Sequence, residues 1–366
     1  MTDEPGVDPI PELPPPAPPA EPAGPPPPVL RAYELPTARR VVTFGLQLAY
    51  RSNGDLRRAS LYIGVLTLAL LGPPLVFLVE FIARFQFADV DAFTSLIEDP
   101  SGAAVGPFMA LILVGYVAIF GWLAVSIDGQ LIAVALLASR ATDQVLSLRQ
   151  ATIRARQVFW RMIRGSFLAG LVSSVVQLVV SAIIVAAIGR TDTSGIFVTL
   201  IAVILLAPLG YLATGVVIGD VGAIEALKRS IRLARARPRI AFVVALFTLL
   251  TAAIQTFALF AGLDVLVRVA AFLHLGVSGG VLPLVLTLLG LLAFVMAFGS
   301  LNFTIAAIVA APQVSAFLGL TYYAGGLDRA RDLAPTAPRF RWVTRPMVVA
   351  MVVVAIASGL GVSSLR

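Results

Sequence analysis

The chain has 366 residues, of which 58% are hydrophobic and only 13% are charged, and its mean hydropathy is +0.94. Soluble domains are roughly 45–50% apolar and about 25% charged, so this composition excludes a soluble fold and predicts a membrane protein. The sequence contains no cysteine and one histidine, His274. Disulfides, thiolate metal sites and paired-histidine metal centres are therefore excluded, and no cofactor is expected.

The first 36 residues differ from the rest of the chain, because they contain fourteen of its 25 prolines and six acidic residues but one cation, Arg31. A segment of this composition cannot bury enough apolar surface to form a core. Residues 1–40 are therefore predicted to be a disordered, proline-rich cytoplasmic tail. Its PxxP spacing also fits a groove on a protein partner, although such spacing arises by chance in any proline-rich run.

Seven apolar segments beyond the tail are long enough to cross about 30 Å of hydrocarbon, which takes roughly 20 residues of helix. Pro208, in the fourth segment, is expected to break or kink it, and Gly215 and Gly219 indicate close helix packing there. The fold class is therefore predicted as all-α, a polytopic bundle of about seven transmembrane helices: Leu61–Ile82, Phe108–Ile127, Ser166–Ile188, Ile196–Gly219, Ile240–Leu263, Leu282–Asn302 and Met347–Leu365.

The basic residues are distributed unevenly between these spans. Twenty-three of the 27 lysines and arginines fall before the first span or after the second, fourth and sixth, and the others are Arg84, Arg190, Arg268 and Arg366. Because cytoplasmic loops collect Lys and Arg, this distribution places the N-terminus in the cytoplasm and the C-terminus outside. We therefore expect a multi-pass protein of the plasma membrane.

Two apolar segments are too long for one crossing. Residues 105–139 contain one charge, Asp128, and residues 281–323 contain none. As helices they would measure about 52 Å and about 64 Å. The second segment could cross twice with a turn near Pro312, but the arginines that follow would then lie outside. We favour a single span that continues into an apolar segment at the cytoplasmic face.

Residues 223–239 carry six basic residues in seventeen. Their helical spacing separates an apolar face, which includes Ile224, Leu227 and Ile231, from a basic face. Pro238 is expected to end this helix. A helix of this kind is too polar to span, and it is suited to lie in the membrane interface with its cations towards anionic headgroups. The candidate headgroup contacts are Lys228, Arg229, Arg232 and Arg235.

A similar basic segment occurs 78 residues earlier. Ala151-Thr-Ile-Arg154 aligns with Arg229-Ser-Ile-Arg232, and Gln177 aligns with Gln255. We therefore predict three units, each an interfacial helix followed by two spans (residues 41–139, 140–219 and 220–323). A cytoplasmic loop completes the membrane domain at residue 345, and a final span occupies residues 346–366. The earlier segment adds three candidate headgroup contacts, Arg154, Arg156 and Arg161.

GDVGAIEALKRSIRLARARPRIAF, residues 219–242, resembles the recurrent signature of the membrane domain of glycerophosphoryl diester phosphodiesterases and of related uncharacterised bacterial membrane proteins. LTYYAGGLDRARD, residues 320–332, is similar to the segment that follows the last repeat of those proteins. The resemblance covers roughly residues 41–332 and implies a repeated helical membrane fold. The enzymatic members owe their activity to a separate soluble barrel with histidines and metal-binding carboxylates, for which we find no counterpart in this sequence.

Five polar side chains fall within or at the ends of the predicted spans. Ionisable groups inside a membrane are costly and often functional. A span that starts at residue 108 reaches Asp128 after about twenty residues, at the far interface, and Asp220 lies at the end of the fourth span, so we favour interfacial positions for both. Gln177, Gln255 and Asn302 lie nearer the middle of their spans, where such amides more often bond neighbouring helices than line a polar path.

These features predict a class of function without naming a substrate. Neither paired carboxylates nor a Ser/Lys dyad indicates an intramembrane enzyme, and the divided basic loops, without an aromatic platform, exclude nucleic acid as a partner. We expect a non-enzymatic, membrane-organising or lipid-interacting protein whose partners are anionic lipids. The alternative is a transporter or permease-like protein, in which Gln177, Gln255, Asn302 and Pro208 would converge between the repeats. The oligomeric state stays open.

Overall fold

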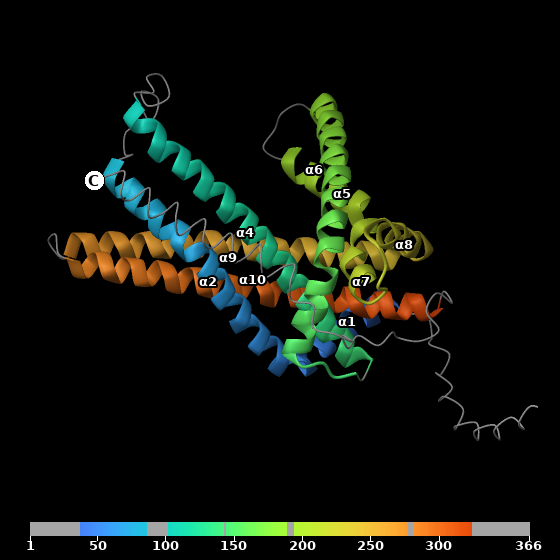
Figure 1. Cartoon of the computed structure of the whole chain (residues 1–366). Coiled ribbons are helices and arrows are strands. Elements are labelled where there is room, and N and C mark those ends of the chain that lie inside the picture. The colour runs from blue at the N-terminus through green and yellow to red at the C-terminus, as the bar shows by residue number, and fades with distance from the viewer. Residues whose placement is uncertain (1–36, 86–101, 143, 189–193, 277–280, 324–366) are drawn as a thin grey trace, which may run out of the picture. The chain divides into compact units, whose positions relative to one another are not determined.

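The computed structural model describes residues 37–85, 102–142, 144–188, 194–276 and 281–323, which all belong to the second of two units, Met1–Glu34 and Leu35–Arg366. The described residues form helices joined by short links, and no strand occurs among them, which confirms the predicted all-α fold for this part of the chain. Most of the predicted tail lies outside it. The helices are α1 (Ala38–Arg51), α2 (Asn53–Phe85), α4 (Gly102–Ala141), α5 (Leu148–Ile188), α6 (Ser194–Leu206), η1 (Ala207–Leu209), α7 (Leu212–Val217), α8 (Ala223–Ala236), α9 (Pro238–Gly276) and α10 (Val281–Tyr323) (Figure 1).

Four described helices are long and apolar enough to cross a membrane, which indicates a membrane protein. Each of the four overlaps one predicted span. The predicted span Leu61–Ile82 lies within α2, which is not one of the four, and Met347–Leu365 lies outside the described residues. The count of seven therefore stays a prediction. The four apolar stretches are Ile112–Ala141 in α4, Leu148–Ala187 in α5, Pro238–Gly262 in α9 and Leu289–Thr321 in α10.

The predicted span Ile196–Gly219 is not a single helix. α6 ends at Leu206, a short 3-10 turn follows, and α7 begins at Leu212. Pro208 lies in that turn, because its ring lacks an N–H and clashes with the preceding turn of an α-helix. The predicted break at Pro208 is confirmed. The apolar stretch that remains, Ile201–Val217, is shorter than the roughly 20 residues that a crossing takes.

α10 is one helix of 43 residues that continues through Pro312, so the alternative of two crossings with a turn near that proline is wrong. Protein covers the part of α10 that exceeds one crossing. Gly45 of α1 packs so closely on it that a Cβ at this position would lie 2.7 Å from the backbone nitrogen of Pro312. Phe303 and Phe317, on either side of the proline, are at most 1% exposed.

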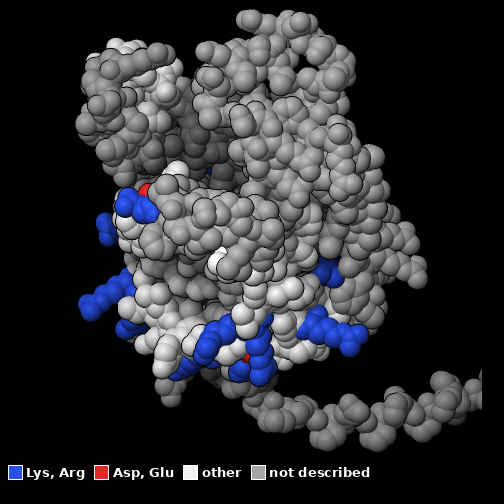
Figure 2. Space-filling model, turned by 90° about the vertical axis from the view of Figure 1, so that its left-hand side faces the viewer, with Lys and Arg blue, Asp and Glu red and all other residues white. Residues whose placement is uncertain are grey.

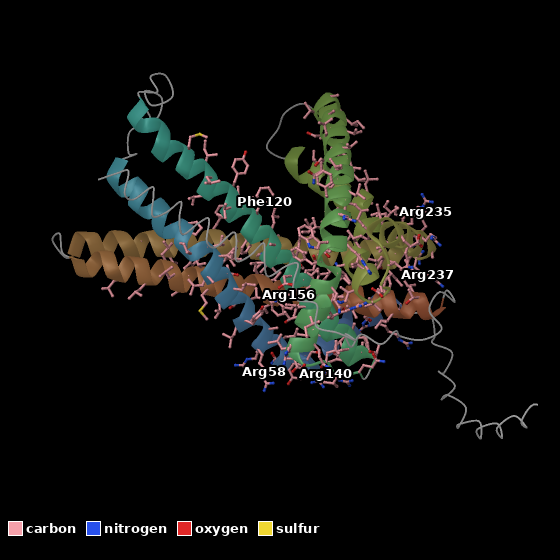
Figure 3. All side chains as sticks on the ribbon, in the orientation of Figure 1. Arg58, Phe120, Arg140, Arg156, Arg235 and Arg237 are labelled. Atoms are coloured by element: carbon pink, nitrogen blue, oxygen red, sulfur yellow. The ribbon has the colours of Figure 1, made fainter. Side chains whose placement is uncertain are left out.

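The excess length of α4 is covered in the same way. Every residue from Leu131 to Ala138 is at most 1% exposed, because α1, α2, α5, α7 and α10 all pack against this helix. Nearer its start, Tyr116 and Phe120 are exposed, and Figure 3 shows Phe120 on the upper part of α4, above the labels of Arg156, Arg140 and Arg58. Soluble proteins rarely expose apolar patches as large as those on α4, α5 and α9, so lipid is the environment that fits these surfaces.

Small residues bring α2 and α10 together. The hydroxyl of Ser60 donates to the backbone carbonyl of Ser300, and the hydroxyl of Ser300 donates to the carbonyl of Ser60, each at 3.1 Å. A Cβ on Gly64 would lie 2.8 Å from the backbone carbonyl oxygen of Met296. Such close approach through small residues is typical of helix pairs in membranes.

Candidate functional site

α8 is the basic amphipathic helix that the sequence predicts. It ends at Ala236, and Pro238 begins α9, a position where the missing N–H of proline costs nothing. Lys228, Arg232 and Arg235 are exposed, as expected for the basic face, and Arg229 is half-buried. The exposed cations are therefore available to a charged partner.

The face of α8 that packs on the protein coincides only in part with its apolar face. Ala234, Ser230 and Leu233 are buried, whereas Ile224 is 62% exposed. The hydroxyl of Ser230 donates to the backbone carbonyl of Pro208 and accepts from the backbone N–H of Tyr211. These are backbone groups that the break at Pro208 leaves without the usual helical partners. The hydrogen bonds of Ser230 to Pro208 and Tyr211, together with the apolar residues of α8, therefore fix which face of α8 packs on the protein.

α7 and α8 pack closely, as the two glycines of the predicted fourth span indicate. A Cβ on Gly215 would lie 3.4 Å from the Cβ of Ala226, which is itself fully buried. A side chain larger than alanine has no room at this contact. The link that follows α7, residues 218–222, is consequently held against the start of α8.

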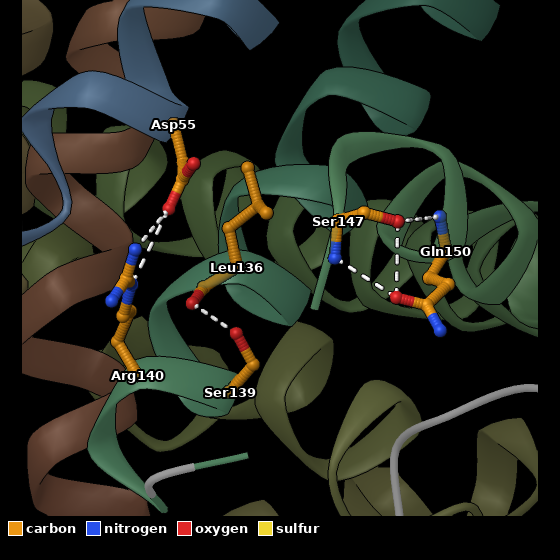
Figure 4. Close-up of polar contacts among 6 residues, drawn as sticks. All are labelled: Asp55, Leu136, Ser139, Arg140, Ser147 and Gln150. Carbon is orange, nitrogen blue, oxygen red and sulfur yellow. Dashed lines mark hydrogen bonds and ion pairs between the residues drawn. The ribbon is translucent and has the colours of Figure 1, made fainter. Parts of the chain in front are cut away.

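The earlier basic segment is not a separate interfacial helix. α5 runs without a break from Leu148 to Ile188, so the basic residues and the apolar stretch form one helix. A capping box fixes its start: Gln150 Oε1 accepts from the backbone N–H of Ser147 at 2.9 Å, and Ser147 Oγ accepts from that of Gln150 at 3.3 Å (Figure 4). The predicted repeat of an interfacial helix followed by two spans is therefore not confirmed.

Two of the three candidate headgroup contacts in α5 lie inside the protein. Arg154 and Arg156 are 9% and 8% exposed, so little of either side chain is accessible to a headgroup. Arg154 Nη2 donates to the backbone carbonyl of Val217, and Arg156 Nη2 donates to the hydroxyl of Tyr62, both at 2.8 Å. Arginine is buried only where it finds such partners, and these acceptors come from α7 and α2.

Asp220, in the link between α7 and α8, forms ion pairs with arginines of α5. Its Oδ1 lies 2.8 Å from Arg161 Nη1 and 3.4 Å from Arg154 Nη2. Arg229 reaches the same link, since its Nη1 lies 3.0 Å from the place that a Cβ on Gly219 would take. Asp220 itself has a φ of 49°, in the left-handed region that aspartate tolerates better than most residues. The carboxylate therefore lies in an inter-helix link, paired with cations.

We call Asp220 with Arg154, Arg161 and Arg229 the arginine cluster. Arg154 and Arg161 pair with the one carboxylate, and Arg229 reaches the same link, so the cluster is positively charged. Guanidinium groups present paired N–H donors that match phosphate oxygens, and the side chain of Arg161 is 45% exposed. Arg161, the exposed arginine of the cluster, and the exposed cations of α8 can together hold a phosphate-bearing group.

Other cations lie at the ends of α2 and α4. Arg140 Nη2 is 2.7 Å from Asp55 Oδ2, which joins the last turn of α4 to the first turn of α2 (Figure 4). Each charge also has the sign that its helix end favours. Figure 3 labels Arg58 and Arg140 in the lower part of its view, and in Figure 2 the described Lys and Arg side chains lie in the lower and middle parts of the face drawn.

A second polar group joins three helices. Gln255 of α9 donates from its side-chain amide to the side-chain oxygen of Asn302 in α10, and Asn302 donates to Ser126 Oγ of α4 at 3.4 Å. Gln177 of α5 is exposed and is not part of this chain of hydrogen bonds. Of the four residues expected to converge in a transporter, only Gln255 and Asn302 are joined here. Both use their side-chain amides in hydrogen bonds to neighbouring helices.

Asp128 lies inside the protein. Its exposure is 0%, and it is near the middle of the apolar stretch Ile112–Ala141. α4 continues for thirteen residues beyond Asp128, to Ala141, and other helices pack on that continuation. The interfacial position of Asp128 stays a prediction. Neither carboxylate oxygen has a hydrogen-bond partner among the described residues.

Comparison with known proteins leaves the function open. The chain matches no protein-family model, no curated protein and no solved structure. Among the described residues no group of three or more histidine, cysteine, aspartate or glutamate side chains is placed to hold a metal ion. The argument for function therefore rests on the arginine cluster, the exposed face of α8 and the buried polar side chains.

Sequence reasoning missed several residues of these sites. Ser230 and Tyr62 are single hydroxyl groups in ordinary helical sequences, and Ser126 is one of several serines in apolar helices. The only local signal is that Ser230 occupies the predicted boundary between the faces of α8. Its partner Pro208 lies 22 residues away in sequence, so the contact could not be predicted without the fold.

Proposed function

We propose that this protein is a non-enzymatic, multi-pass protein of the plasma membrane that binds anionic lipids through α8 and the neighbouring arginine cluster. In this proposal the basic side of the protein, with the N-terminus, faces the cytoplasm. The observation that carries it is the arrangement of α8, which exposes the apolar residue Ile224 and, further along the same helix, Lys228, Arg232 and Arg235. A helix that exposes both cations and an apolar side chain suits the boundary between headgroups and acyl chains.

The magnitude of the attraction supports retention of lipid. Three exposed cations near an anionic surface contribute about 1 kcal/mol each, and the sum is screened over a Debye length. Arg161 and Arg229 add charge where α5 meets the start of α8. The ion pair of Arg232 with Glu225, at 3.1 Å, involves exposed side chains, so a phosphate group can compete for that guanidinium at little cost.

Native mass spectrometry of the purified chain with phosphatidylglycerol tests the proposal. Changing Lys228, Arg232 and Arg235 to glutamine should lower the amount of bound phosphatidylglycerol by at least tenfold, since roughly 3 kcal/mol of attraction is removed. The matched control changes three other exposed cations, Arg51, Arg57 and Arg58, to glutamine. Equal losses in both variants would show that net charge alone retains the lipid, and an unchanged α8 variant would refute the proposal.

A transporter or permease-like protein is the second candidate. The observation in its favour is the hydrogen-bonded chain Gln255–Asn302–Ser126, which brings polar groups of three helices together. A small solute that co-purifies with the wild type and is lost on Asn302→Leu would support this candidate. The same chain of bonds is what helix–helix packing alone requires, so bound lipid without a bound solute favours the first proposal.

The relationship to the membrane domain of glycerophosphoryl diester phosphodiesterases is also a proposal. It is supported by residues 219–242, which form most of the link after α7, all of α8 and the beginning of α9. Such kinship would concern the membrane fold alone, because the activity of the enzymatic members resides in their separate barrel.

A further inference from the structure

We propose that Asp128 is a proton-binding site, at which the carboxyl group holds a proton where α2 and α5 approach α4. This goes beyond lipid binding, because the residue lies in the interior and takes no part in the surface of α8. Asp128 is the acidic residue of a forty-residue helix that has no other carboxylate. It is 0% exposed, so bulk water does not solvate it.

The surroundings of Asp128 offer it little stabilisation as an anion. Both carboxylate oxygens lack a hydrogen-bond donor among the described residues. Arg156 from α5 acts on it electrostatically, and Arg156 Nη2 donates a hydrogen bond of 2.8 Å to the hydroxyl of Tyr62 from α2. From α10, the ring of Phe303 lies against Gly129, the next residue. α7 carries no charged residue, and the charged residues of α1, Arg39, Arg40 and Arg51, are exposed.

A proton is the ligand that fits this environment. An ionised carboxylate without donors is strongly disfavoured in a protein interior, and protonation removes its charge. Arg156 favours the anion, but its Nη2 is engaged with Tyr62 and no nitrogen of it hydrogen-bonds the carboxylate. The same guanidinium repels a metal cation. The carboxyl group is therefore best accommodated when neutral.

The proton site is distinct from the polar chain of Gln255, Asn302 and Ser126. Ser126 precedes Asp128 by two residues, and residues two apart on a helix point to different faces. Asp128 accordingly has Tyr62 and Arg156 near it, whereas Ser126 meets Asn302. A substitution at one site leaves the contacts of the other in place.

The pH dependence of unfolding tests the proposal through its sign. The full chain and its Asp128→Asn variant are unfolded thermally in detergent between about pH 5 and about pH 8, above the unfolded aspartate pKa of about 3.9. If the folded protein holds the proton, unfolding releases it. The folding equilibrium constant of the wild type, relative to that of the variant, then falls about tenfold for each pH unit of increase, as long as the folded carboxyl stays protonated.

The opposite protonation state gives a different result. A carboxylate that is ionised in the folded protein releases no proton on unfolding, so the difference between wild type and variant would stay constant or move in favour of the wild type as the pH rises. In that case the Asp128→Asn change would also remove a negative charge that balances Arg156, and the melting temperature of the variant would fall by roughly 5 °C or more. Either result overturns the proposal.

Reaction with dicyclohexylcarbodiimide locates the proton. A protonated carboxyl adds to this reagent: its oxygen bonds the central carbon, its proton moves to a nitrogen, and acyl transfer to nitrogen leaves a stable acylurea with no leaving group. We expect the adduct on Asp128, more rapidly at lower pH and absent from Asp128→Asn. Asp55, paired with Arg140, is the internal control. Faster modification of Asp55 than of Asp128 would contradict the proposal, and the pH comparison decides it if the reagent fails to enter.

Discussion

Residues 148–161 align with residues 226–239, and the protein uses these two basic segments differently. The first is the beginning of a long helix and places two arginines inside the protein, whereas the second is a separate helix with its cations on the surface. The side chain of Arg154 is 10% exposed, while that of Arg232, at the aligned position, is 70% exposed. Similar charge patterns in the sequence therefore do not imply similar environments.

The two segments differ in the burial of their arginines because different groups pack against them. Arg154 finds the carbonyl of Val217 and the carboxylate of Asp220, which α7 and its link bring to α5. The inward face of α8 presents small residues to α7 and η1, and Ala234 occupies the position aligned with Arg156. A buried cation needs an acceptor that a distant element supplies, and only the first segment has one.

The largest expected effect distinguishes the two aligned arginines. Arg154→Gln should lower the free energy of unfolding by about 3 kcal/mol, because it leaves the carbonyl of Val217 unsatisfied and removes a buried charge partner of Asp220. Arg232→Gln, the matched control, should change it by less than about 0.5 kcal/mol. Thermal unfolding of both variants in detergent measures the difference. Equal losses would mean that the two segments are equally packed.

A smaller effect is expected at the link that follows α7. A Cβ on Gly219 would lie 2.5 Å from the backbone carbonyl oxygen of Gly215 and 3.0 Å from Arg229 Nη1. Gly219→Ala should therefore destabilise the protein by about 2 kcal/mol, since backbone and guanidinium must both shift. Gly222→Ala is the control, because nothing lies within 4 Å of its Cβ position. If the two variants melt alike, the link is less closely packed than the geometry indicates.

The aligned hydroxyl residues Ser230 and Thr152 give the next comparison. Ser230 bonds across to the break at Pro208, whereas Thr152 Oγ1 donates to Leu148 within its own helix at 2.9 Å. Ser230→Ala should cost about 1 kcal/mol or more, because backbone groups at η1 lose their partner. Thr152→Val keeps the shape and removes only a local bond, so its melting temperature should stay closer to that of the wild type. The reverse order would show that α8 is not held by Ser230.

The sequence predicted most of the helices, because their bounds depend on residues that are close together in the chain. The bounds of α8 follow from its charges and Pro238, and the break after α6 follows from Pro208. The burial of Arg154 and Asp128 was not predictable, because their surroundings come from helices far apart in sequence. Likewise, the uncharged length of α4 and α10 exceeds one crossing, and only the packing of α1 on α10 and of several helices on α4 shows that protein covers the excess.

The smallest expected effect on stability concerns the exposed cations of α8. Changing Lys228, Arg232 and Arg235 together to glutamine should leave the melting temperature within about 2 °C of the wild type, since exposed charges contribute little to folding. The orientation should also be unchanged, because most of the cations that set it remain. A cysteine at Gly54 or Arg149, both exposed, should then resist impermeant thiol reagents added outside intact cells, in the variant as in the wild type. Loss of bound phosphatidylglycerol without loss of stability would assign the cations of α8 to lipid binding. A large drop in the melting temperature would instead show that α8, like the beginning of α5, uses its cations to hold the protein together.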